Sequence, residues 1–295
     1  MNWAPRILQF GATGQLAREL IARDRGKAVT ALSREQVDLT DTRAVADAIA
    51  DADVDLVVNA AAYTAVDRAE SEEDLAFAVN AAAPGAMAQA CARRKIPLIH
   101  LSTDYVFDGE KAGAWREDDP IGPLNAYGRT KAAGETAVAQ SGARALVLRA
   151  SWVFSPYGRN FVKTMLNAAR TRDVLDVVDD QHGRPTAAGE IAEFIFAVAP
   201  ALTSAIGDAS AGVFHFAGEG ATTWRGLADA IFERAPGPRP RIEPIATADY
   251  PTPARRPMNS VLDCEKLERV LGVRPRPWRE GLAETLKQLG AETHA

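Results

Sequence analysis

Residues 6–17 read RILQFGATGQLA, a short apolar run followed by a turn that contains two glycines. The apolar run predicts a buried strand, and the amphipathic pattern after the turn predicts a helix that ends near about residue 24. Gly11 and Gly14 have no Cβ atom, so a pyrophosphate can approach the backbone, and the N–H groups of a helix N-terminus bind such an anion. Ala17, at the end of a G-x-x-G-x-x-A spacing, is small enough for close packing of helix on strand. This stretch therefore predicts the start of a dinucleotide-binding Rossmann unit.

Apolar strands and helical patterns alternate through the first half of the chain. Further strands are predicted at residues 27–33, 55–61, 97–103 and 144–151, with helices at residues 42–51, 72–94 and 127–141. This alternation is typical of a parallel sheet with helices on both faces. Later, shorter strands (174–178, 213–217, 241–245) mix with helices (160–171, 187–199, 224–234, 263–271). We expect an α/β fold: a Rossmann-type doubly wound parallel sheet in residues 1–152, and a smaller C-terminal substrate lobe in residues 153–295, from which some elements can return to the sheet.

The composition limits the classes of partner. The chain has 295 residues and a net charge of -5, which argues against nucleic acid or an anionic membrane. Its longest apolar run, residues 191–202, is too short to span a bilayer. Cys91 and Cys264 have no metal-ligand spacing, so no metal site is expected. No signal peptide is recognised, and the expected location is cytoplasmic.

Ligands of such sheets bind beyond the carboxyl ends of the strands. Ser33 and Arg34 end the second strand, where a carboxylate would bind the ribose and repel a 2′-phosphate. These two residues predict NADPH as the cofactor, with NADH as the alternative. Asp38 lies on the next connection, where it can meet the adenine amino group. Residues 60–62, which are all alanine, end the third strand and leave room for a flat cofactor.

Tyr127 and Lys131 are separated by one helical turn, so both side chains point the same way. An ammonium beside a phenol lowers a tyrosine pKa that is ordinarily near ~10, and such a tyrosine can give a proton to a developing alkoxide. Thr103, at the end of the fourth strand, would lie beside Tyr127 and can hydrogen-bond the same substrate oxygen. A Ser/Thr–Tyr–Lys set around one carbonyl oxygen is the arrangement of nicotinamide-dependent carbonyl reduction.

These motifs together resemble the extended short-chain dehydrogenase/reductases and, more narrowly, the dTDP-4-dehydrorhamnose reductase family. The resemblance runs through ordered blocks at residues 11–16, 59–70, 102–107, 149–153, 180–186 and 250–257, nearly the whole chain. It implies reduction of the 4-keto group of dTDP-4-dehydro-L-rhamnose to dTDP-L-rhamnose, with a small nucleotide sugar as the partner. A homodimer is compatible with it.

The resemblance also implies roles for single positions. Thr103, Tyr127 and Lys131 match the catalytic set, and Thr103, Asp104 and Trp152 match residues that hold the sugar. With the residues named above for the cofactor, the expected cofactor contacts are Gly11, Thr13, Gly14, Gln15, Leu16, Ser33, Arg34, Asp38, Leu39, Ala60, Ala62, Tyr63, Thr64, Tyr127 and Lys131. Tyr63 stands where the family often has histidine. A magnesium ion known at a dimer interface in some members is not carried over, because Gln15 is uncharged and no carboxylate cluster is evident.

Arg256 lies in a proline-stiffened loop and is the candidate for the substrate diphosphate, because a guanidinium fork suits phosphate oxygens. Asn160 opens a predicted helix near the same edge and is a further candidate for substrate binding, and Trp152 could cover the sugar.

Three other functions remain to be weighed. A sugar-nucleotide 4,6-dehydratase would need acid and base carboxylates after Thr103, where this chain has Asp104 and then Tyr105. A 4-epimerase fits the block at residues 102–104 less well. A non-catalytic regulatory subunit, of the kind that binds methionine adenosyltransferase, also resembles this family. The complete set of Thr103, Tyr127 and Lys131 argues against lost catalysis.

Overall fold

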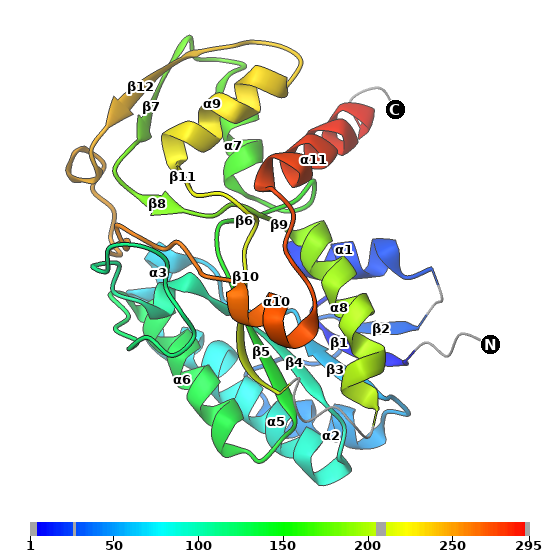
Figure 1. Ribbon diagram of the computed structural model, residues 1–295. Helices are drawn as coiled ribbons and strands as arrows, with labels where there is room; N and C mark the ends of the chain where they lie inside the picture. Colours follow the sequence, from blue (N-terminus) through cyan, green and yellow to red (C-terminus); the bar gives the residue numbers. More distant parts are fainter. Residues whose placement is uncertain (1–4, 26–27, 205–210, 293–295) are drawn as a thin grey trace.

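The computed structural model describes residues 5–25, 28–204 and 211–292, and within them it has a six-stranded parallel sheet (Figure 1). The strand order is β10-β5-β4-β3-β1-β2. The strands are β1 (Ile7–Phe10), β2 (Val29–Leu32), β3 (Leu56–Asn59), β4 (Leu98–Thr103), β5 (Ala145–Ala150) and β10 (Gly212–Phe216). The predicted start of the second strand at Lys27 lies outside the described residues. Because β1 lies between β2 and β3, the order of strands reverses there, and the ligand crevice of such a sheet opens at the carboxyl ends of β1 and β3.

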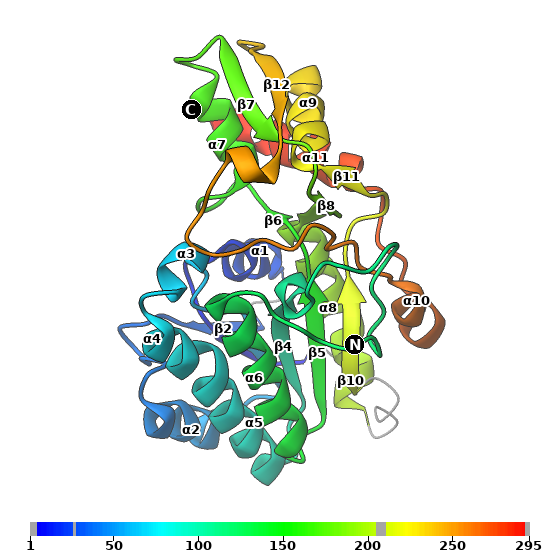
Figure 2. The same ribbon diagram turned by 90° about the vertical axis from the view of Figure 1, so that its left-hand side faces the viewer.

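Helices cover both faces of the sheet, which confirms the doubly wound fold (Figures 1 and 2). α1 (Gln15–Arg23) and α8 (Ala188–Thr203) lie on one face; α2 (Thr42–Asp51), α5 (Ala83–Arg94) and α6 (Ala126–Gln140) lie on the other. Neighbouring strand residues point to opposite faces. Val58 accordingly packs in the cluster with Leu20 and Ile195, whereas Val57 packs with Ile49 and Met87.

The helix predicted at residues 72–94 is interrupted. It consists of α4 (Glu73–Phe77), a π-helical turn η1 (Ala78–Ala82) and α5. Pro84 has no N–H to give to the carbonyl of Asn80, four residues earlier, and such a gap favours a wider turn. Gly134 of α6 packs directly on this turn, since a Cβ there would lie 2.1 Å from the Asn80 carbonyl oxygen. Among the described residues, this 22-residue stretch is long and apolar enough to cross a membrane, but 56% of its apolar window is buried inside the protein, as in a core helix.

The smaller lobe is built around a parallel strand pair and three helices. β7 (Val174–Val178) pairs with β12 (Arg241–Ile245), and α7 (Phe161–Ala168), α9 (Trp224–Arg234) and α11 (Trp278–Glu292) pack beside them. Short pairs join β6 (Val153–Phe154) to β9 (Thr186–Ala187) and β8 (His182–Gly183) to β11 (Thr222–Thr223). α11 was not among the predicted helices.

Several segments after residue 152 belong to the main sheet. β10 pairs with β5 in parallel, from Gly212 opposite Leu146 to Phe216 opposite Ala150, and α8 packs against α1. α10 (Glu265–Leu271) lies beside β10. The smaller lobe predicted at residues 153–295 left room for elements that return to the sheet. The apolar side chains of α8 and β10, such as Ile195 and Phe214, are buried in the core of the main sheet. The chain therefore passes between the lobes several times (Figure 2).

Candidate active site

The glycine turn has the shape that a dinucleotide needs. Gly11 has a φ of 95°, and a Cβ on it would lie 3.1 Å from the Cβ of Ala61. Gly14 is the N-cap of α1 and provides no side-chain cap, so the first N–H groups of that helix are not bound by a capping side chain. An anion placed there would meet free backbone donors at the positive end of the helix dipole. The structure thus brings the glycine turn and the alanines after β3 together.

The predicted adenine end of the site is exposed. The Arg34 guanidinium lies 3.5 Å from the Asp38 carboxylate, and its side chain is 75% exposed, so it can turn towards a phosphate. The Ser33 hydroxyl interacts with Glu35 and lowers the pKa of that carboxyl. Leu39 is buried in the core. Glu35, which no sequence motif marked, adds a second carboxylate beside the place expected for a 2′-phosphate.

Asn80 holds Tyr63 in the segment after β3 that is expected to contact the cofactor, and the sequence patterns did not single it out. Its side chain accepts from the Tyr63 N–H (2.9 Å), donates to the Tyr63 carbonyl (3.0 Å) and donates to the Thr130 hydroxyl of α6 (3.2 Å). The Tyr63 phenol donates to Glu72 at 2.6 Å. Asn80 lies in the π-helical turn, and Pro84 was the signal in the sequence that could have marked this interruption.

Tyr127 and Thr103 meet at the carboxyl end of β4. α6 begins after Asn125, whose side chain accepts from the Gly128 N–H at 2.8 Å. Gly128 lets the helix approach closely, since a Cβ there would lie 2.2 Å from the Tyr105 carbonyl oxygen. The Tyr127 hydroxyl consequently lies near that of Thr103, and its ring packs edge-on against that of Tyr105, with the centroids 5.7 Å apart.

The ionisation of Tyr127 differs from the sequence-based expectation. Burial raises the pKa of Tyr127 to about 12; the nearby Thr103 hydroxyl acts in the opposite direction and the Asp104 carboxylate adds to the rise. The prediction that Lys131 lowers this pKa is therefore wrong, because the Lys131 ammonium donates to the Leu101 carbonyl instead. Burial lowers the pKa of Lys131 to about 8, against the effect of Glu135. At neutral pH Tyr127 retains its proton and can act as an acid.

Asp104 has a carboxylate oxygen in need of a partner. It is buried, its Oδ1 accepts from the Thr103 hydroxyl at 2.9 Å, and its Oδ2 has no hydrogen bond of ordinary geometry. Burial raises the pKa of Asp104 to about 6, against the effects of the Ser260 and Thr103 hydroxyls. Buried polar atoms are rarely left unpaired, so an unpaired oxygen beside Thr103 suits a ligand hydroxyl.

Trp152 lies at the start of the smaller lobe in an uncommon backbone conformation, with a φ of 48°. Its indole ring stacks on that of Trp224, with the centroids 3.6 Å apart and an angle of 4° between the planes. Its N–H donates to the Ser260 hydroxyl at 3.1 Å. Gly183 makes room for the ring, since a Cβ there would lie 2.3 Å from it. Trp224 was not singled out from the sequence, although it fixes the orientation of Trp152.

Asn160 and Gln15 are bound to each other. The Asn160 amide donates to the Gln15 side-chain oxygen at 2.9 Å, and the Ser155 hydroxyl donates to the same oxygen at 3.1 Å. Asn160 also caps α7 by accepting from the Lys163 N–H at 3.1 Å. These contacts tie the glycine-turn helix to the smaller lobe.

The Arg256 guanidinium makes a two-point contact with Asp67. Its two terminal nitrogens donate to the two carboxylate oxygens at 2.8 and 2.9 Å, and one of them also donates to the Ala254 carbonyl. Asp67 belongs to α3 (Val66–Ala69), the helix that follows the expected cofactor contacts at residues 60–64. Arg256, which was predicted to bind the substrate diphosphate, therefore already binds a carboxylate of this chain.

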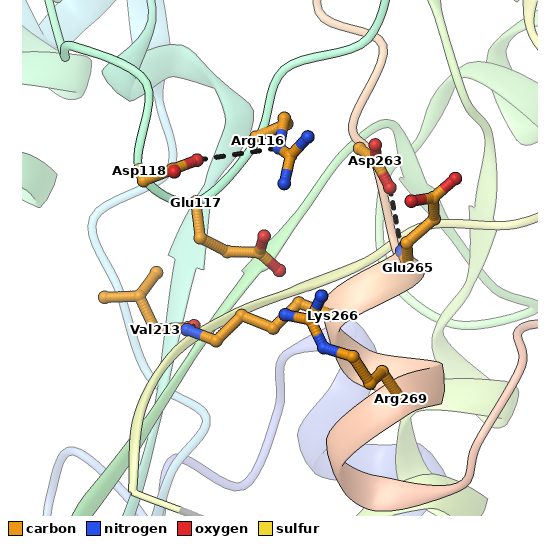
Figure 3. Close-up of a pocket in the computed structure, with 8 residues that line it drawn as sticks. All are labelled: Arg116, Glu117, Asp118, Val213, Asp263, Glu265, Lys266 and Arg269. Carbon is orange, nitrogen blue, oxygen red and sulfur yellow. Dashed lines mark hydrogen bonds and ion pairs between the residues drawn. The ribbon is translucent and has the colours of Figure 1, made fainter.

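None of the site residues described above lines the surface cavity of about 380 Å³ shown in Figure 3. Its lining is charged and comprises Arg116, Glu117, Asp118, Val213, Asp263, Glu265, Lys266 and Arg269. Lys266 donates to the Val213 carbonyl at 2.6 Å and Arg116 lies 3.7 Å from Asp118, so two of its cations have partners within the cavity. Within the described residues, no group of three or more His, Cys, Asp or Glu side chains is arranged to hold a metal ion.

Comparison with known proteins identifies the family. Residues 5–291 match the model of the RmlD substrate binding domain. A dTDP-4-dehydrorhamnose reductase of Sinorhizobium fredii is 45% identical over 279 residues, which is 93% of this chain and 94% of that protein. Among solved structures, a dTDP-4-dehydrorhamnose reductase from Clostridium acetobutylicum superimposes with a TM-score of 0.90 at 36% identity, over 96% of this chain and 99% of that one. The reductase from Bacillus anthracis, solved in complex with NADP, gives a TM-score of 0.89 at 29% identity, over 97% and 100% of the two chains. With this fold, this glycine turn and these relatives, the chain belongs to the dTDP-4-dehydrorhamnose reductase family.

Proposed function

We propose that this protein reduces the 4-keto group of dTDP-4-dehydro-L-rhamnose with NADPH, and that Tyr127 is the general acid. The observation that carries the proposal is the pair of hydroxyls of Tyr127 and Thr103 at the carboxyl end of β4, with the Tyr127 pKa raised to about 12. A phenol that retains its proton at neutral pH can give it to an alkoxide. The names of the relatives, and NADP in the Bacillus anthracis structure, support the substrate and the cofactor.

NADPH, when bound, supplies the hydride; the chain's own residues orient the carbonyl and supply the proton. Thr103 and Tyr127 would both hydrogen-bond the C4 oxygen, which would fix its direction and bring the phenolic proton to it. Asp104 would accept from a sugar hydroxyl through its unpaired Oδ2. Trp152, held by Trp224, would cover the sugar ring.

Residues around the glycine turn would bind the cofactor. The free N–H groups at the start of α1 would hold the pyrophosphate, and Thr13 and Gln15 belong to the same turn. Leu16 is buried in the core, so its contact would be made by backbone. Residues 60–64, fixed by Asn80, would lie along the middle of the dinucleotide.

Arg256 would bind the diphosphate of the nucleotide sugar. Its fork already holds the Asp67 carboxylate with two parallel bonds, an arrangement that phosphate oxygens can also make. The substrate would take the place of Asp67 in this contact.

Such an enzyme would work in the cytoplasm on a small molecule, alone or as a homodimer, without nucleic acid or membrane as a partner.

The decisive experiment mixes the purified chain, NADPH and the keto sugar nucleotide without any other protein. NADPH should be oxidised and the product should be dTDP-L-rhamnose. Tyr127→Phe should lose roughly 10²–10⁴-fold in turnover, the usual contribution of a positioned acid, while NADPH affinity measured by fluorescence stays unchanged.

A Tyr127→Phe variant that keeps more than about a tenth of the wild-type turnover would exclude the general-acid role. A wild-type chain that binds NADPH, oxidises none of it and alters the activity of a partner enzyme would instead identify a regulatory subunit.

A further inference from the structure

Three consecutive residues of β4 each meet a side chain of α6. The Leu101 carbonyl accepts from the Lys131 ammonium, the Ser102 hydroxyl donates to the Glu135 carboxylate, and the Thr103 hydroxyl lies near that of Tyr127. The α6 partners follow one another at intervals of four residues, so they form a single row on the face that meets the sheet. Glu135 thus lies one turn beyond Lys131, in the same row as the candidate catalytic groups.

The Glu135 carboxylate is held from the neighbouring strand as well. Arg149 of β5 lies opposite Ser102 in the sheet register, and its guanidinium donates to both Glu135 oxygens, at 2.9 and 2.7 Å. The two side chains are only 5% and 7% exposed. His215 of β10 lies opposite Arg149 and faces it with Nε2 at 3.4 Å, while its Nδ1 faces the carbonyls of Trp115 and Asp263.

A buried ion pair is costly to desolvate, and apolar side chains of similar volume often replace one without loss of stability. Stability alone therefore does not explain why charged side chains are buried in this row. The position of Glu135, one turn from the buried Lys131 ammonium, indicates an effect on Lys131 instead. We propose that Glu135 is a positioning residue for the reduction, which keeps Lys131 protonated and in place, and that Ser102 and Arg149 hold its carboxylate for this task. This inference rests on the proposed function and on the expectation from the sequence that Lys131 contacts the cofactor and belongs to the catalytic set.

The other titratable and charged groups that face Lys131 do not provide this anion. His100 on β4 is neutral, because burial and the nearby Lys131 keep its pKa well below the ordinary value. Tyr127 carries its proton at neutral pH, and the Asp104 carboxylate acts on Tyr127 without raising the pKa of Lys131. Arg149 on β5 brings a positive charge. Among these groups, Glu135 is the one that raises the pKa of Lys131 against the effect of burial.

The test compares Glu135→Gln with Arg149→Gln, two isosteric or near-isosteric changes on opposite sides of the pair. Turnover and NADPH affinity, the latter by fluorescence titration, are measured from neutral to alkaline pH. Both should decline in the wild type as Lys131 loses its proton. Glu135→Gln removes the anion and leaves the Arg149 charge, so the decline should move to lower pH by about one unit. Arg149→Gln leaves the anion unopposed, so the decline should keep its position or move to higher pH.

A purely structural pair gives a different pattern: both variants would melt at a lower temperature and both pH profiles would keep the wild-type decline. That result would overturn the inference. If a single substitution prevents folding, the double variant Glu135→Leu/Arg149→Met removes both charges and should fold, because no buried charge is left unpaired. Its alkaline decline should still lie at lower pH than that of the wild type, and an unchanged decline would also overturn the inference.

Lys131→Met separates the inference from the function on which it rests. If Lys131→Met keeps full turnover, Lys131 has no part in the reaction and the proposed catalytic set fails. If Lys131→Met is inactive while the Glu135 and Arg149 variants keep the wild-type profile, the catalytic set stands and only the positioning role of Glu135 falls.

Discussion

Two arginine–carboxylate pairs in this molecule share a geometry and differ in burial. Arg149 donates hydrogen bonds of 2.7 and 2.9 Å to Glu135, and Arg256 donates hydrogen bonds of 2.8 and 2.9 Å to Asp67. The side chains of the first pair are 5% and 7% exposed, whereas those of the second are 18% and 43% exposed. The first pair lies in the core of the main sheet, and the second joins a proline-rich loop to α3.

This difference in burial decides whether a partner can be exchanged. A buried carboxylate that loses its arginine has no water to replace it, so breaking the pair is expensive. A partly exposed carboxylate can be solvated, and such pairs contribute little to stability. The same two-point contact can therefore be a fixed support in the core and a replaceable contact at the surface. Replaceability is what a substrate diphosphate would require of Arg256.

Glu135→Ala should have the largest effect on stability. Removing one partner of a buried pair leaves the Arg149 charge without compensation, which costs ~3–5 kcal/mol of unfolding free energy. Chemical denaturation followed by circular dichroism measures this loss. A loss below about 1 kcal/mol, as expected for a surface pair, would show that burial does not distinguish the two pairs.

Arg34→Ala extends the comparison to a third pair, Arg34 with Asp38, whose side chains are 75% and 44% exposed. Stability should not change. NADPH affinity should fall roughly tenfold, because a hydrogen bond to a charged phosphate would be lost, while NADH affinity stays constant. Arg43→Ala is the matched control, since Arg43 is 91% exposed and pairs with Asp47 on α2. Equal losses for the two cofactors would mean that Arg34 does not recognise the 2′-phosphate.

Arg256→Ala should have a smaller effect, and on binding rather than on folding. TDP should inhibit this variant roughly three- to tenfold less strongly than it inhibits the wild type. The expected effect is smaller than at a buried site because Arg256 and Asp67 are partly exposed. NADPH affinity should not change. Thermal unfolding should shift little. Arg255→Ala, at the exposed neighbouring position, is the control. If TDP inhibits the Arg256 variant as well as the wild type, the diphosphate binds elsewhere and Arg255 becomes the next candidate.

Local patterns predicted the elements well where periodicity is strong. The helix at residues 224–234 and the strand at residues 241–245 have the predicted bounds. The pattern at residues 213–217 predicted a strand but not its partner, because the pairing of β10 with β5 depends on a contact between distant segments. Apolar alternation alone does not say which sheet a strand joins.

The candidate site shows the same limit. Spacing placed Tyr127 and Lys131 on one face of a helix, but it could not show that the ammonium binds the Leu101 carbonyl or that burial raises the Tyr127 pKa. Asn80 could not be identified from the sequence, because its contacts depend on a π-helical turn that local patterns do not predict. Glu135 was visible in principle, since it continues the four-residue spacing of Tyr127 and Lys131.

The return of β10 to the edge of the main sheet has a consequence for synthesis on the ribosome. When residue 152 has emerged, β5 is complete but has no neighbour on its outer side, and β10 follows only with residues 212–216. During that interval an apolar strand edge is open to pairing with other nascent chains, a known hazard for partly made sheets. A fragment cut at residue 152 would keep that open edge permanently and would also lack α8 over one face. The N-terminal half should therefore aggregate when it is expressed alone, and in the whole chain the edge of β5 is paired only after residues 212–216 have been synthesised.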